Sequence, residues 1–285
     1  MITFIICSIH PDKAAAVEKN VRETIGLPCE FIIEDNRETG NGICNVYNRC
    51  AQRAIYDNLC FLHEDVVFHG TDWGMPVIDK LQEKETGVIG FMGSIYKSKA
   101  PSGWNVVPSI NRSHFVQTKC GESRKSDEGT GTFRSCLILD GACLFVRREV
   151  WNANPFDEVS LSGFHCYDID FSLQVAANGF RNYVCGAVWL EHLSEGNFSK
   201  SWADATLRLY LHKWTQPMLA TGLSDEELHY IGQHSSYIEA RCFYIFLKNQ
   251  RHRKWNKEEL GVLRPLLLDH LSQPVLFLKC LLYLL

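Results

Sequence analysis

The stretch Phe61-Leu62-His63-Glu64-Asp65-Val66-Val67 predicts a buried strand that ends in an acidic turn. Apolar residues stand on both sides of three chemically active ones, His63, Glu64 and Asp65. Open α/β sheets place their ligand crevice at the carboxyl ends of strands, where such a turn would lie. Divalent cations favour oxygen and imidazole ligands. Because short acidic turns are also common solvated features, this stretch alone leaves a ligand site and an ordinary turn as alternatives.

The chain before this stretch alternates short apolar runs with helical patterns. Residues 2–6 and 31–33 are apolar enough for buried strands, and residues 13–25 carry apolar side chains at helical spacing. A glycine-bearing turn at residues 40–42 leads into a second helical pattern over residues 43–55. Because crossover helices join parallel strands, this β-α-β-α-β order predicts a parallel, doubly wound sheet.

The chain after this stretch continues the alternation and then loses it. Residues 72–83 are an expected helix with Asp72 as its N-cap, and residues 88–92 are an expected strand. No periodicity is visible from residue 93 to residue 134, where glycine, serine, proline, lysine and asparagine dominate. Such a long structureless connection is uncommon inside a domain and often functional, and a disordered insertion is the alternative.

The second half of the chain returns to the α/β pattern and then changes to helices. Strand-like runs within residues 136–146 precede a helix that Asp168 opens and Gly179 ends, and further strand-like runs follow. The helical patterns beyond them span residues 202–214, 225–232, 237–249 and 257–271. We therefore expect an α/β fold with a mostly parallel central sheet flanked by helices over residues 1–200, and a helical C-terminal region over residues 201–285.

The composition excludes several classes of protein. Of the 285 residues, 46% are hydrophobic and 22% are charged, which is typical of globular proteins. The net charge of −4 and the scattered basic residues argue against a nucleic-acid partner. Twelve cysteines without a C-x-x-C pair favour reduced thiols over a disulfide framework or a zinc ribbon. Without a basic signal-peptide segment or a window of about 18 apolar residues, a cytoplasmic protein is expected.

Polar side chains at the strand ends outline a site of nucleotide size. Ser8, Asp35 and Asn48 fall on strand-to-helix connections or at a helix start along one edge of the expected sheet. A carboxylate after the second strand can accept hydrogen bonds from a uracil imide or a ribose. The G-x-G at residues 40–42 continues into neither G-x-G-x-x-G nor a phosphate-binding lysine, which argues against NAD and P-loop sites. A simple turn-forming role for Asp35 is the alternative.

Asp65 and His192 are candidate ligands of a divalent cation. Asp65 follows the third strand, and His192 follows a much later strand-like run. If both strands lie near the centre of the sheet, the carboxylate and the imidazole would meet over one ion. The cation would neutralise a diphosphate and stabilise it as a leaving group. A structural or surface histidine is the alternative for His192.

The segment His165-Cys166-Tyr167-Asp168-Ile169-Asp170 carries a candidate general base. Residues two apart on a helix do not share a face, so Asp168 and Asp170 should have different roles. One can point into a cleft while the other caps the helix. A carboxylate near a helix start is favoured as the anion, which suits a base. The alternative is that both aspartates only cap the start of the helix and take no part in a reaction.

Eight segments in order resemble the GT-A glycosyltransferases of the family-2, inverting type. They are similar above all to a bacterial subgroup that includes streptomycin-biosynthesis-type proteins, and they cover about residues 1–200. The segments are FIICSIH, IIEDNRE, GICNVYNRCAQRA, FLHEDVVF, LDGACLFVRREVW, PFDE, FHCYDIDFSLQVAANGF and LEHLSEGN. Each one alone is a weak signal, but their order and spacing together are fairly specific.

The resemblance implies a donor side of the site. Asp35 is similar to the residue that reads the base of a nucleotide diphosphate sugar, and Ser8 and Asn48 are expected beside it. Glu64 stands where other members often carry aspartate. It is therefore expected to contact the ribose, or to contact the metal ligands without binding the metal itself.

The resemblance also implies a metal site. Asp65 is similar to the last acid of the family's D-x-D motif, which holds Mn²⁺ or Mg²⁺ on the diphosphate, and His192 matches a late metal-binding histidine. His63 departs from the pattern, because other members often carry aspartate there.

The resemblance implies, further, an acceptor side and a base. Asp140 and Gly141 match the family's acceptor-side D-G pair, and Asp170 is placed on the same side. Asp168 aligns with the aspartate of the family's E-D motif, the catalytic base. Tyr167 replaces the usual glutamate, so the support around the base is expected to differ.

The implied reaction moves a sugar from a nucleoside diphosphate sugar, with a UDP-sugar as the expected donor, to a hydroxyl group with inversion. The acceptor would be a glycan, a lipid-linked molecule or a small molecule, within bacterial surface polysaccharide or glycoconjugate synthesis. Two alternatives remain at this stage. A sugar nucleotidyltransferase would need a glycine-rich basic loop after the first strand, and residues 8–13 do not provide one. A non-catalytic nucleotide-sugar or glycan-binding protein would show no turnover that depends on Asp168.

The C-terminal tail is strongly apolar but too short to span a bilayer. Six of the twelve residues 274–285 are leucine, and a basic stretch at residues 251–257 precedes them. Such a tail can lie on a membrane surface as a peripheral contact. Packing on its own domain and packing in a homodimer are the alternatives.

Overall fold

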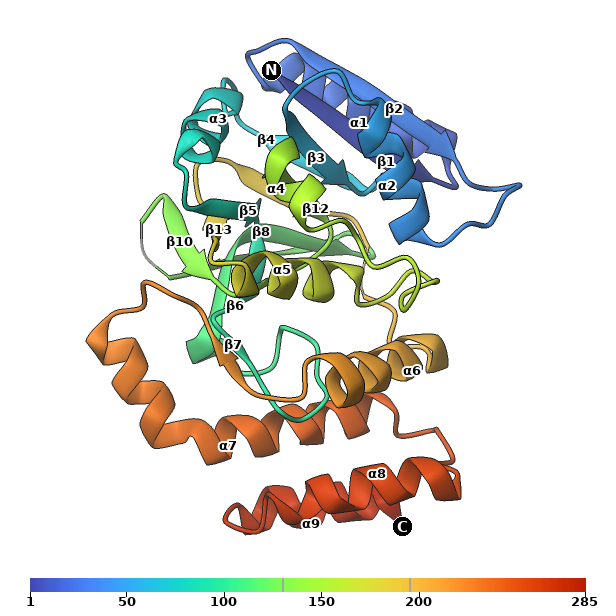
Figure 1. The fold of residues 1–285 in the computed structure, drawn as a ribbon, viewed down its shortest axis with the longest axis vertical. Helices are drawn as coiled ribbons and strands as arrows, with labels where there is room; N and C mark the ends of the chain where they lie inside the picture. Colours follow the sequence, from blue (N-terminus) through green and yellow to red (C-terminus); the bar gives the residue numbers. More distant parts are fainter. Residues whose placement is uncertain (130, 195) are drawn as a thin grey trace.

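A seven-stranded mixed sheet forms the centre of the N-terminal part of the protein (Figure 1). The computed structural model describes residues 1–129, 131–194 and 196–285. The strand order is β10-β13-β5-β12-β3-β1-β2. The strands are β1 (Ile2–Ser8), β2 (Cys29–Asp35), β3 (Asn58–Leu62), β5 (Thr86–Gly90), β10 (Phe133–Cys136), β12 (Cys143–Arg147) and β13 (Arg181–Cys185).

Helices cover both faces of this sheet. The side chains of β1 alternate, so that Phe4 packs toward α1 (Pro11–Thr24) and α3 (Gly74–Gln82), whereas Ile5 packs toward the opposite face. That opposite face is covered by α2 (Ile43–Arg53), α4 (Arg148–Ala153) and α5 (Tyr167–Ala177). The two apolar layers fix the positions of the strand ends.

A second sheet lies beside the first and contributes the other half of the site. Its path is β11-β6-β8-β14-β4, and β9 pairs with β8. Its strands are β4 (Val66–His69), β6 (Met92–Ser94), β8 (Asn111–Lys119), β9 (Glu122–Glu128), β11 (Ile138–Leu139) and β14 (Trp189–His192). β4 follows β3 directly through residues 63–65. Because β14 runs antiparallel to β4 with His192 opposite Val66, the end of β14 lies against that turn.

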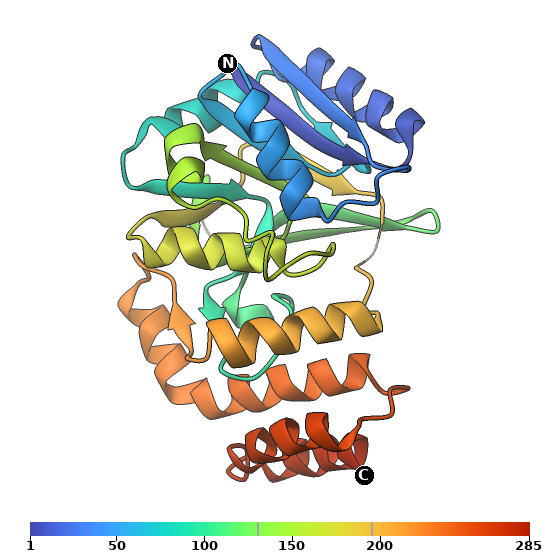
Figure 2. The same ribbon diagram turned by 45° about the vertical axis from the view of Figure 1, so that its right-hand side comes forward.

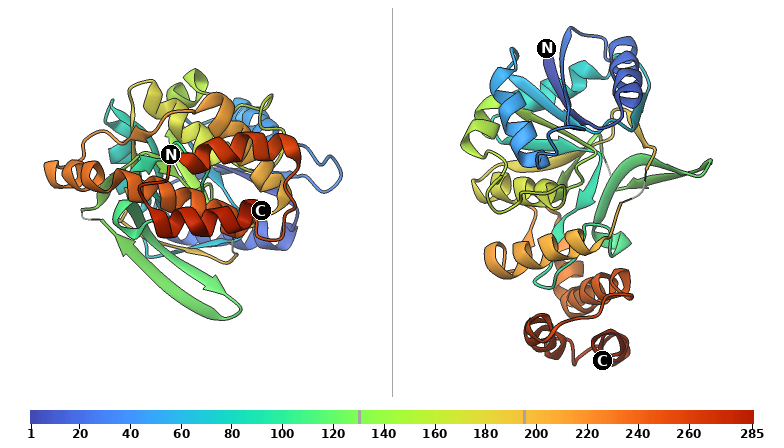
Figure 3. Two further views of the ribbon diagram at one scale, coloured as in Figure 1. Left: turned by 90° about the horizontal axis from the view of Figure 1, so that it is seen from below. Right: turned by 90° about the vertical axis from the view of Figure 1, so that its right-hand side faces the viewer.

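The C-terminal part is a stack of helices at the end of the molecule away from the N-terminus (Figures 2 and 3). Its elements are α6 (Lys200–Arg208), a π-helical turn (Leu209–Lys213), β15 (Met218–Leu219), α7 (Asp225–Asn249), α8 (Lys257–Leu268) and α9 (Pro274–Leu284). Capping boxes start α7 at Ser224 and α8 at Asn256. β15 pairs with β7 (Tyr96–Lys97), which joins this part to the α/β part.

The sheet is mixed rather than parallel, although its first strands agree with the prediction. β1 pairs in parallel with β2 and β3, as the helical crossovers require. β12 runs antiparallel to β3 and β5, because only the short turn at residues 140–142 leads into it and no crossover helix precedes it. The expectation of a mostly parallel sheet flanked by helices holds for the first half of the chain.

The predicted irregular connection from residue 93 to residue 134 is wrong in its centre. It contains the 3₁₀ turn Pro108–Ile110 and a long hairpin of β8 and β9, which projects from the body in Figures 2 and 3. The hairpin turns at Cys120 and Gly121, which have φ angles of 49° and 82°. Two residues with positive φ match the right-handed twist of paired strands, so Cys120-Gly121 is the missed turn signal.

Three smaller expectations also fail. Asp72 does not cap α3: Trp73 precedes the helix, and Asp72 has a φ of 57°. The two helices predicted over residues 225–232 and 237–249 form the single α7, because the polar residues between them lie on its solvent side and do not interrupt it. β15 lies in a region predicted to hold helices only.

Candidate active site

The turn between β3 and β4 sends neighbouring side chains in different directions. Glu64 reaches back to β1, where its carboxylate accepts hydrogen bonds from the Ser8 hydroxyl at 2.6 Å and from the backbone N–H groups of Ile9 and His10. Asp65 lies instead beside His192 at the end of β14. The Glu64 carboxylate therefore contacts the end of β1, whereas the Asp65 carboxylate belongs to a separate cluster at the end of β14.

His63, Asp65 and His192 form the cluster at the end of β14. An Asp65 carboxylate oxygen lies 3.5 Å from Nε2 of His192 and 3.9 Å from Nδ1 of His63. One ligand atom from each residue lies within 4.8 Å of the other two. The predicted pair Asp65 and His192 is therefore brought together, and His63 joins it as a third potential ligand.

The charges of the cluster favour an ionised carboxylate. Burial works to raise the pKa of Asp65, but hydrogen bonds from His192 and Ser194 and the neighbouring imidazoles hold that pKa well below its usual range. Burial also works to lower the pKa of His192, and the hydrogen bond to Asp65 outweighs it, so this pKa is raised. Burial and the nearby His192 lower the pKa of His63. The cluster thus offers a carboxylate anion between two imidazoles.

Asp168 lies at the start of α5 and faces the turn that precedes β12. Its carboxylate accepts a hydrogen bond of 3.0 Å from the backbone N–H of Gly141. Cys166, just before the helix, has a left-handed φ of 65°, a strained conformation for a residue with a side chain. Loss of solvent and the charge of Asp140 raise the pKa of Asp168 to about 7. These effects outweigh the helix start, which was expected to favour the anion.

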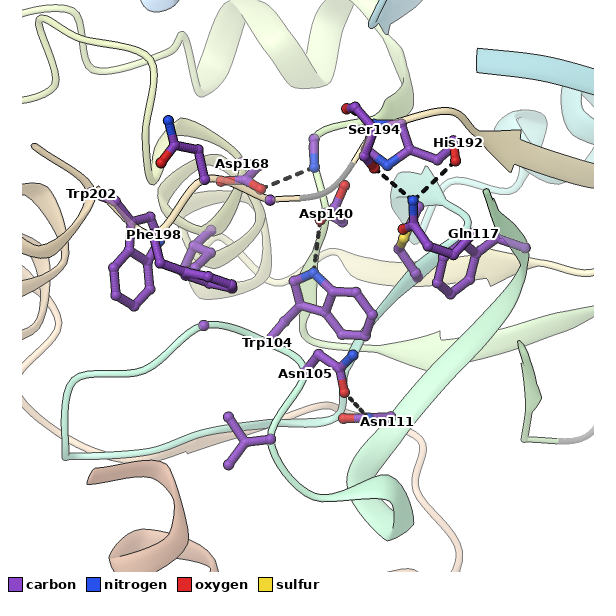
Figure 4. Close-up of a pocket in the computed structure, with 18 of the residues that line it drawn as sticks. Trp104, Asn105, Asn111, Gln117, Asp140, Asp168, His192, Ser194, Phe198 and Trp202 are labelled. Carbon is purple, nitrogen blue, oxygen red and sulfur yellow. Dashed lines mark hydrogen bonds between the residues drawn. The ribbon is translucent and has the colours of Figure 1, made fainter. Parts of the chain in front are cut away.

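Asp140 is held in the same cleft by two donors (Figure 4). One carboxylate oxygen accepts from the backbone N–H of Ala142, and the other accepts from the indole N–H of Trp104 at 2.8 Å. The Trp104 indole thereby fixes the carboxylate that raises the pKa of Asp168.

Tyr167 connects the cluster to the turn at Gly141 that binds Asp168. Its hydroxyl lies 2.7 Å from Nε2 of His63 and donates to the carbonyl oxygen of Gly141 at 3.2 Å. Glycine is required at 141, because a Cβ there would lie 2.1 Å from the Tyr167 hydroxyl oxygen. The D-G pair therefore has a structural task beside its predicted acceptor role.

One cleft with a volume of about 710 Å³ is lined by Asp140, Asp168, Tyr167 and the two imidazoles of His63 and His192. Its walls come from the α/β part, from the hairpin and from α6 and α7. Figure 4 shows Asp168, Asp140 and His192 around it, with the aromatic rings of Trp104, Phe198 and Trp202. A cleft of this size that combines carboxylates, imidazoles and aromatic rings is typical of a site for a small polar ligand.

The predicted donor residues lie partly together. Ser8 and Asp35 are opposite each other in the register of β1 and β2, and Glu64 binds Ser8. The Asp35 carboxylate is exposed and paired with Arg37, which holds its pKa below the usual value. Asn48 lies elsewhere, because its amide contacts the backbone of Phe156.

Asp170 is buried away from the cleft. Its carboxylate accepts hydrogen bonds from Lys213 at 2.9 Å and from the indole N–H of Trp214 at 2.7 Å. The structure thus separates Asp168 and Asp170, as their spacing predicts, and uses Asp170 to join α5 to the segment after α6.

His63 was not among the expected metal ligands: it was set aside as a departure from the family pattern, although an imidazole at a strand end is itself a ligand signal. Tyr167 was noted only as the replacement of the usual glutamate, and its contact with His63 was not predicted. Trp104 had no expected role, because its hydrogen bond to Asp140 joins residues that are distant in the sequence.

Comparison with known proteins assigns the chain to a family. It matches the model of the Glycosyltransferase like family over residues 3–213. No curated protein matches it in sequence. The structure is similar to the crystal structure of GalNAc-T7 with UDP, GalNAc and Mn²⁺, with a TM-score of 0.52 and 11% identity over 95% of this chain and 54% of that chain. The chain thus spans about half the length of that protein.

A second similar structure is the mannosyltransferase PcManGT from Pyrobaculum calidifontis in complex with GDP-Man and Mn²⁺. Its TM-score is 0.50, with 12% identity over 99% of this chain and 84% of that chain. Both likenesses support the expected α/β fold of the GT-A type, with a central sheet between helices. Because the family model matches residues 3–213, well over half of the sequence, the chain belongs to the Glycosyltransferase like family.

Proposed function

We propose that this chain is a metal-dependent, inverting glycosyltransferase that uses a nucleoside diphosphate sugar, with a UDP-sugar as the expected donor. The observation that carries the proposal is the shared cleft, whose lining includes Asp168 together with His63 and His192, the two imidazoles of the cluster that Asp65 completes. A base on one side and a cation site on the other are what a single displacement at an anomeric carbon needs.

The cluster fits a divalent cation by its donor chemistry. It offers one carboxylate and two imidazoles at mutual distances that one ion can bridge. The two similar structures are described with Mn²⁺ and with UDP or GDP-Man, which supports Mn²⁺ or Mg²⁺ as the cofactor here. Such an ion would neutralise the diphosphate and stabilise the departing nucleoside diphosphate.

Asp168 would act as the general base. In the proposed reaction its carboxylate takes the proton of an acceptor hydroxyl, and the hydroxyl oxygen forms the new bond to the anomeric carbon. The bond from that carbon to the diphosphate oxygen breaks, and its electron pair leaves with the nucleoside diphosphate. Because attack and departure occur on opposite faces, the configuration inverts. Asp140 raises the basicity of Asp168, and the Gly141 N–H orients it.

The donor nucleotide would lie along the ends of β1 and β2. Ser8 and Glu64 form one side of this region and Asp35 the other. Arg37 occupies both oxygens of Asp35, so recognition of a uracil N–H would require Arg37 to move or to share the carboxylate. Asn48 would then act by holding residue 156 rather than by touching the nucleotide.

The acceptor would occupy the aromatic part of the cleft. Trp104, Phe198 and Trp202 present flat apolar surfaces there, and sugar rings pack well on such surfaces. Asp140 and Gly141 border the same space, whereas Asp170 would support it from behind. A glycan, a lipid-linked molecule or a small hydroxyl compound in surface polysaccharide or glycoconjugate synthesis is the proposed acceptor class.

The outer face of α9 would provide a peripheral membrane contact. None of the helices in the described ranges is long and apolar enough to cross a bilayer. Four residues at helical spacing on α9 and its end are each more than half exposed, and these are Val275, Leu278, Leu282 and Leu285. Residues 270–285 contain no acidic side chain, and exposed cations precede them at Arg251, Lys254, Lys257 and Arg264. An apolar helix face that follows basic residues in the chain suits an anionic lipid surface.

A flotation assay with anionic vesicles tests this contact. We expect the wild type to float and Leu278→Glu/Leu282→Glu to remain in solution. Concentration-dependent dimerisation of the wild type, without flotation and lost in the same variant, would assign the face to a homodimer instead.

A donor panel tests the proposed reaction. UDP- and GDP-sugars are incubated with Mn²⁺, and the released nucleoside diphosphate and the anomeric configuration of the product are measured. We expect UDP release with inversion. Formation of a nucleotide sugar from sugar phosphate and nucleoside triphosphate would favour a nucleotidyltransferase. Nucleotide-sugar binding without turnover by any acceptor or by water would favour a binding protein.

A further inference from the structure

The two ring nitrogens of His63 face different partners. Nδ1 is directed to the cluster, 3.9 Å from the Asp65 carboxylate, whereas Nε2 lies 2.7 Å from the Tyr167 hydroxyl. A neutral imidazole carries its hydrogen on one nitrogen only, so the partner at Nε2 decides whether Nδ1 presents a lone pair.

The Tyr167 hydroxyl can accept that hydrogen because its own hydrogen has another acceptor. The carbonyl oxygen of Gly141 lies 3.2 Å away and accepts from the hydroxyl. The Tyr167 oxygen is then available to Nε2–H of His63, and Nδ1 is left free of hydrogen. A hydrogen bond at the far nitrogen is how ligating histidines are commonly oriented and made more basic.

His192 presents a second imidazole to the same point. Its Nε2 lies 3.5 Å from the oxygen of Asp65 that also faces His63, and the two imidazole rings are 5.8 Å apart between centroids. The cluster therefore offers two nitrogen donors and one carboxylate. Mg²⁺ prefers oxygen ligands and near-octahedral geometry, whereas imidazole suits the later divalent transition metals, and Mn²⁺ stands at the weak end of the transition-metal affinity order.

We infer that Tyr167 is the positioning residue that fixes the ligating form of His63, and that with His63 in this form the site proposed above at residues 63, 65 and 192 selects transition-metal ions over Mg²⁺. This inference rests on the proposed function and narrows its cofactor. It also gives Gly141 a defined task, since the absence of a side chain leaves room for the Tyr167 hydroxyl.

Metal binding by the full chain without nucleotide tests the site directly. Calorimetry and Mn²⁺ electron paramagnetic resonance would measure the affinity for Mn²⁺, Co²⁺ and Mg²⁺. We expect Mn²⁺ to bind more tightly than Mg²⁺, and Co²⁺ more tightly than Mn²⁺. Tyr167→Phe should weaken Mn²⁺ binding by about 10- to 100-fold, as loss of a hydrogen bond to a ligating histidine does. His63→Asp should reduce the preference for Mn²⁺ over Mg²⁺.

Tyr210→Phe is the matched control, because it removes another buried tyrosine hydroxyl, one whose partner is Ser102. It should leave all three affinities unchanged. Equal affinities for Mn²⁺ and Mg²⁺, absence of Mn²⁺ binding at millimolar concentration, or Mn²⁺ binding that both Tyr167→Phe and His63→Asp leave intact would overturn the inference. Because these measurements need no substrate, a protein that binds metals as expected but transfers no sugar would contradict the proposed function alone.

Discussion

Replacing the proposed base by its neutral isostere should make the protein more stable while removing its activity. Asp168→Asn keeps the shape of the side chain and an oxygen that can accept the Gly141 N–H. It removes a negative charge that lies beside Asp140 and has lost part of its solvent, the two causes that raise the Asp168 pKa to about 7. Charge placed for function at the expense of stability is a common feature of active sites.

The magnitude follows from that pKa. An ordinary aspartyl group titrates at 3.8, and the interval to about 7 corresponds to a cost of about 4 kcal/mol for the ionised form in the folded state. Asp168 keeps some contact with solvent in the cleft, so we discount this to about 2 kcal/mol. Because the folded-state pKa is raised, the wild type binds more protons when folded. The free energy of unfolding of the wild type therefore falls by this cost as the pH rises from about 4 through about 7.

Thermal unfolding of both proteins between pH 5 and pH 8.5 measures the effect. We expect Asp168→Asn to melt at least about 4 °C above the wild type at pH 8.5, with a gain that shrinks steadily toward pH 5. Asp35→Asn, at an exposed carboxylate paired with Arg37, is the control and should show no gain. A variant that melts at or below the wild type at pH 8.5 would refute the proposed repulsion between Asp140 and Asp168.

Three further results are expected. Gly141→Ala forces a Cβ against the Tyr167 hydroxyl and should lower stability by about 1–3 kcal/mol in chemical unfolding; an unchanged midpoint would contradict the close contact. Glu64→Gln weakens the acceptor of the Ser8 hydroxyl and should cost about 1 kcal/mol at pH 7. Because hydrogen bonds outweigh burial and lower the pKa of Glu64, this difference should vanish on acidification, which unfolding curves at falling pH would check. Turnover should rise with pH through about 7 as Asp168 ionises, and a pH-independent rate would contradict its role as base.

The sequence allowed the first half of the fold and the main site residues to be predicted because their signals are local. Short apolar runs and helical spacing define β1, α1 and β2, and each strand ends in the polar residue that the site uses. Asp65, His192 and Asp168 were proposed as site residues in this way, since each follows a strand or opens a helix. The antiparallel insertion of β12 depends on pairing between distant strands, which no local pattern reports.

The finer chemistry of the site could not be predicted for a similar reason. His63 and Tyr167 stood out in the sequence as two separate departures from the family pattern, 104 positions apart. The structure shows that they touch, so that each explains the other. In the same way, the pKa of Asp168 depends on the approach of Asp140, which comes from a different element.

One measurement tests the central claim that Asp168 is the base opposite a metal-bound donor. Mn²⁺-dependent binding of UDP and turnover of the UDP-sugar are measured in parallel for the wild type, Asp168→Asn and Asp65→Asn. We expect Asp168→Asn to keep metal-dependent UDP binding but to lose turnover by about 10²- to 10⁴-fold, whereas Asp65→Asn should lose both. Turnover by Asp168→Asn at the wild-type rate, or UDP binding by Asp65→Asn with undiminished metal dependence, would contradict the claim.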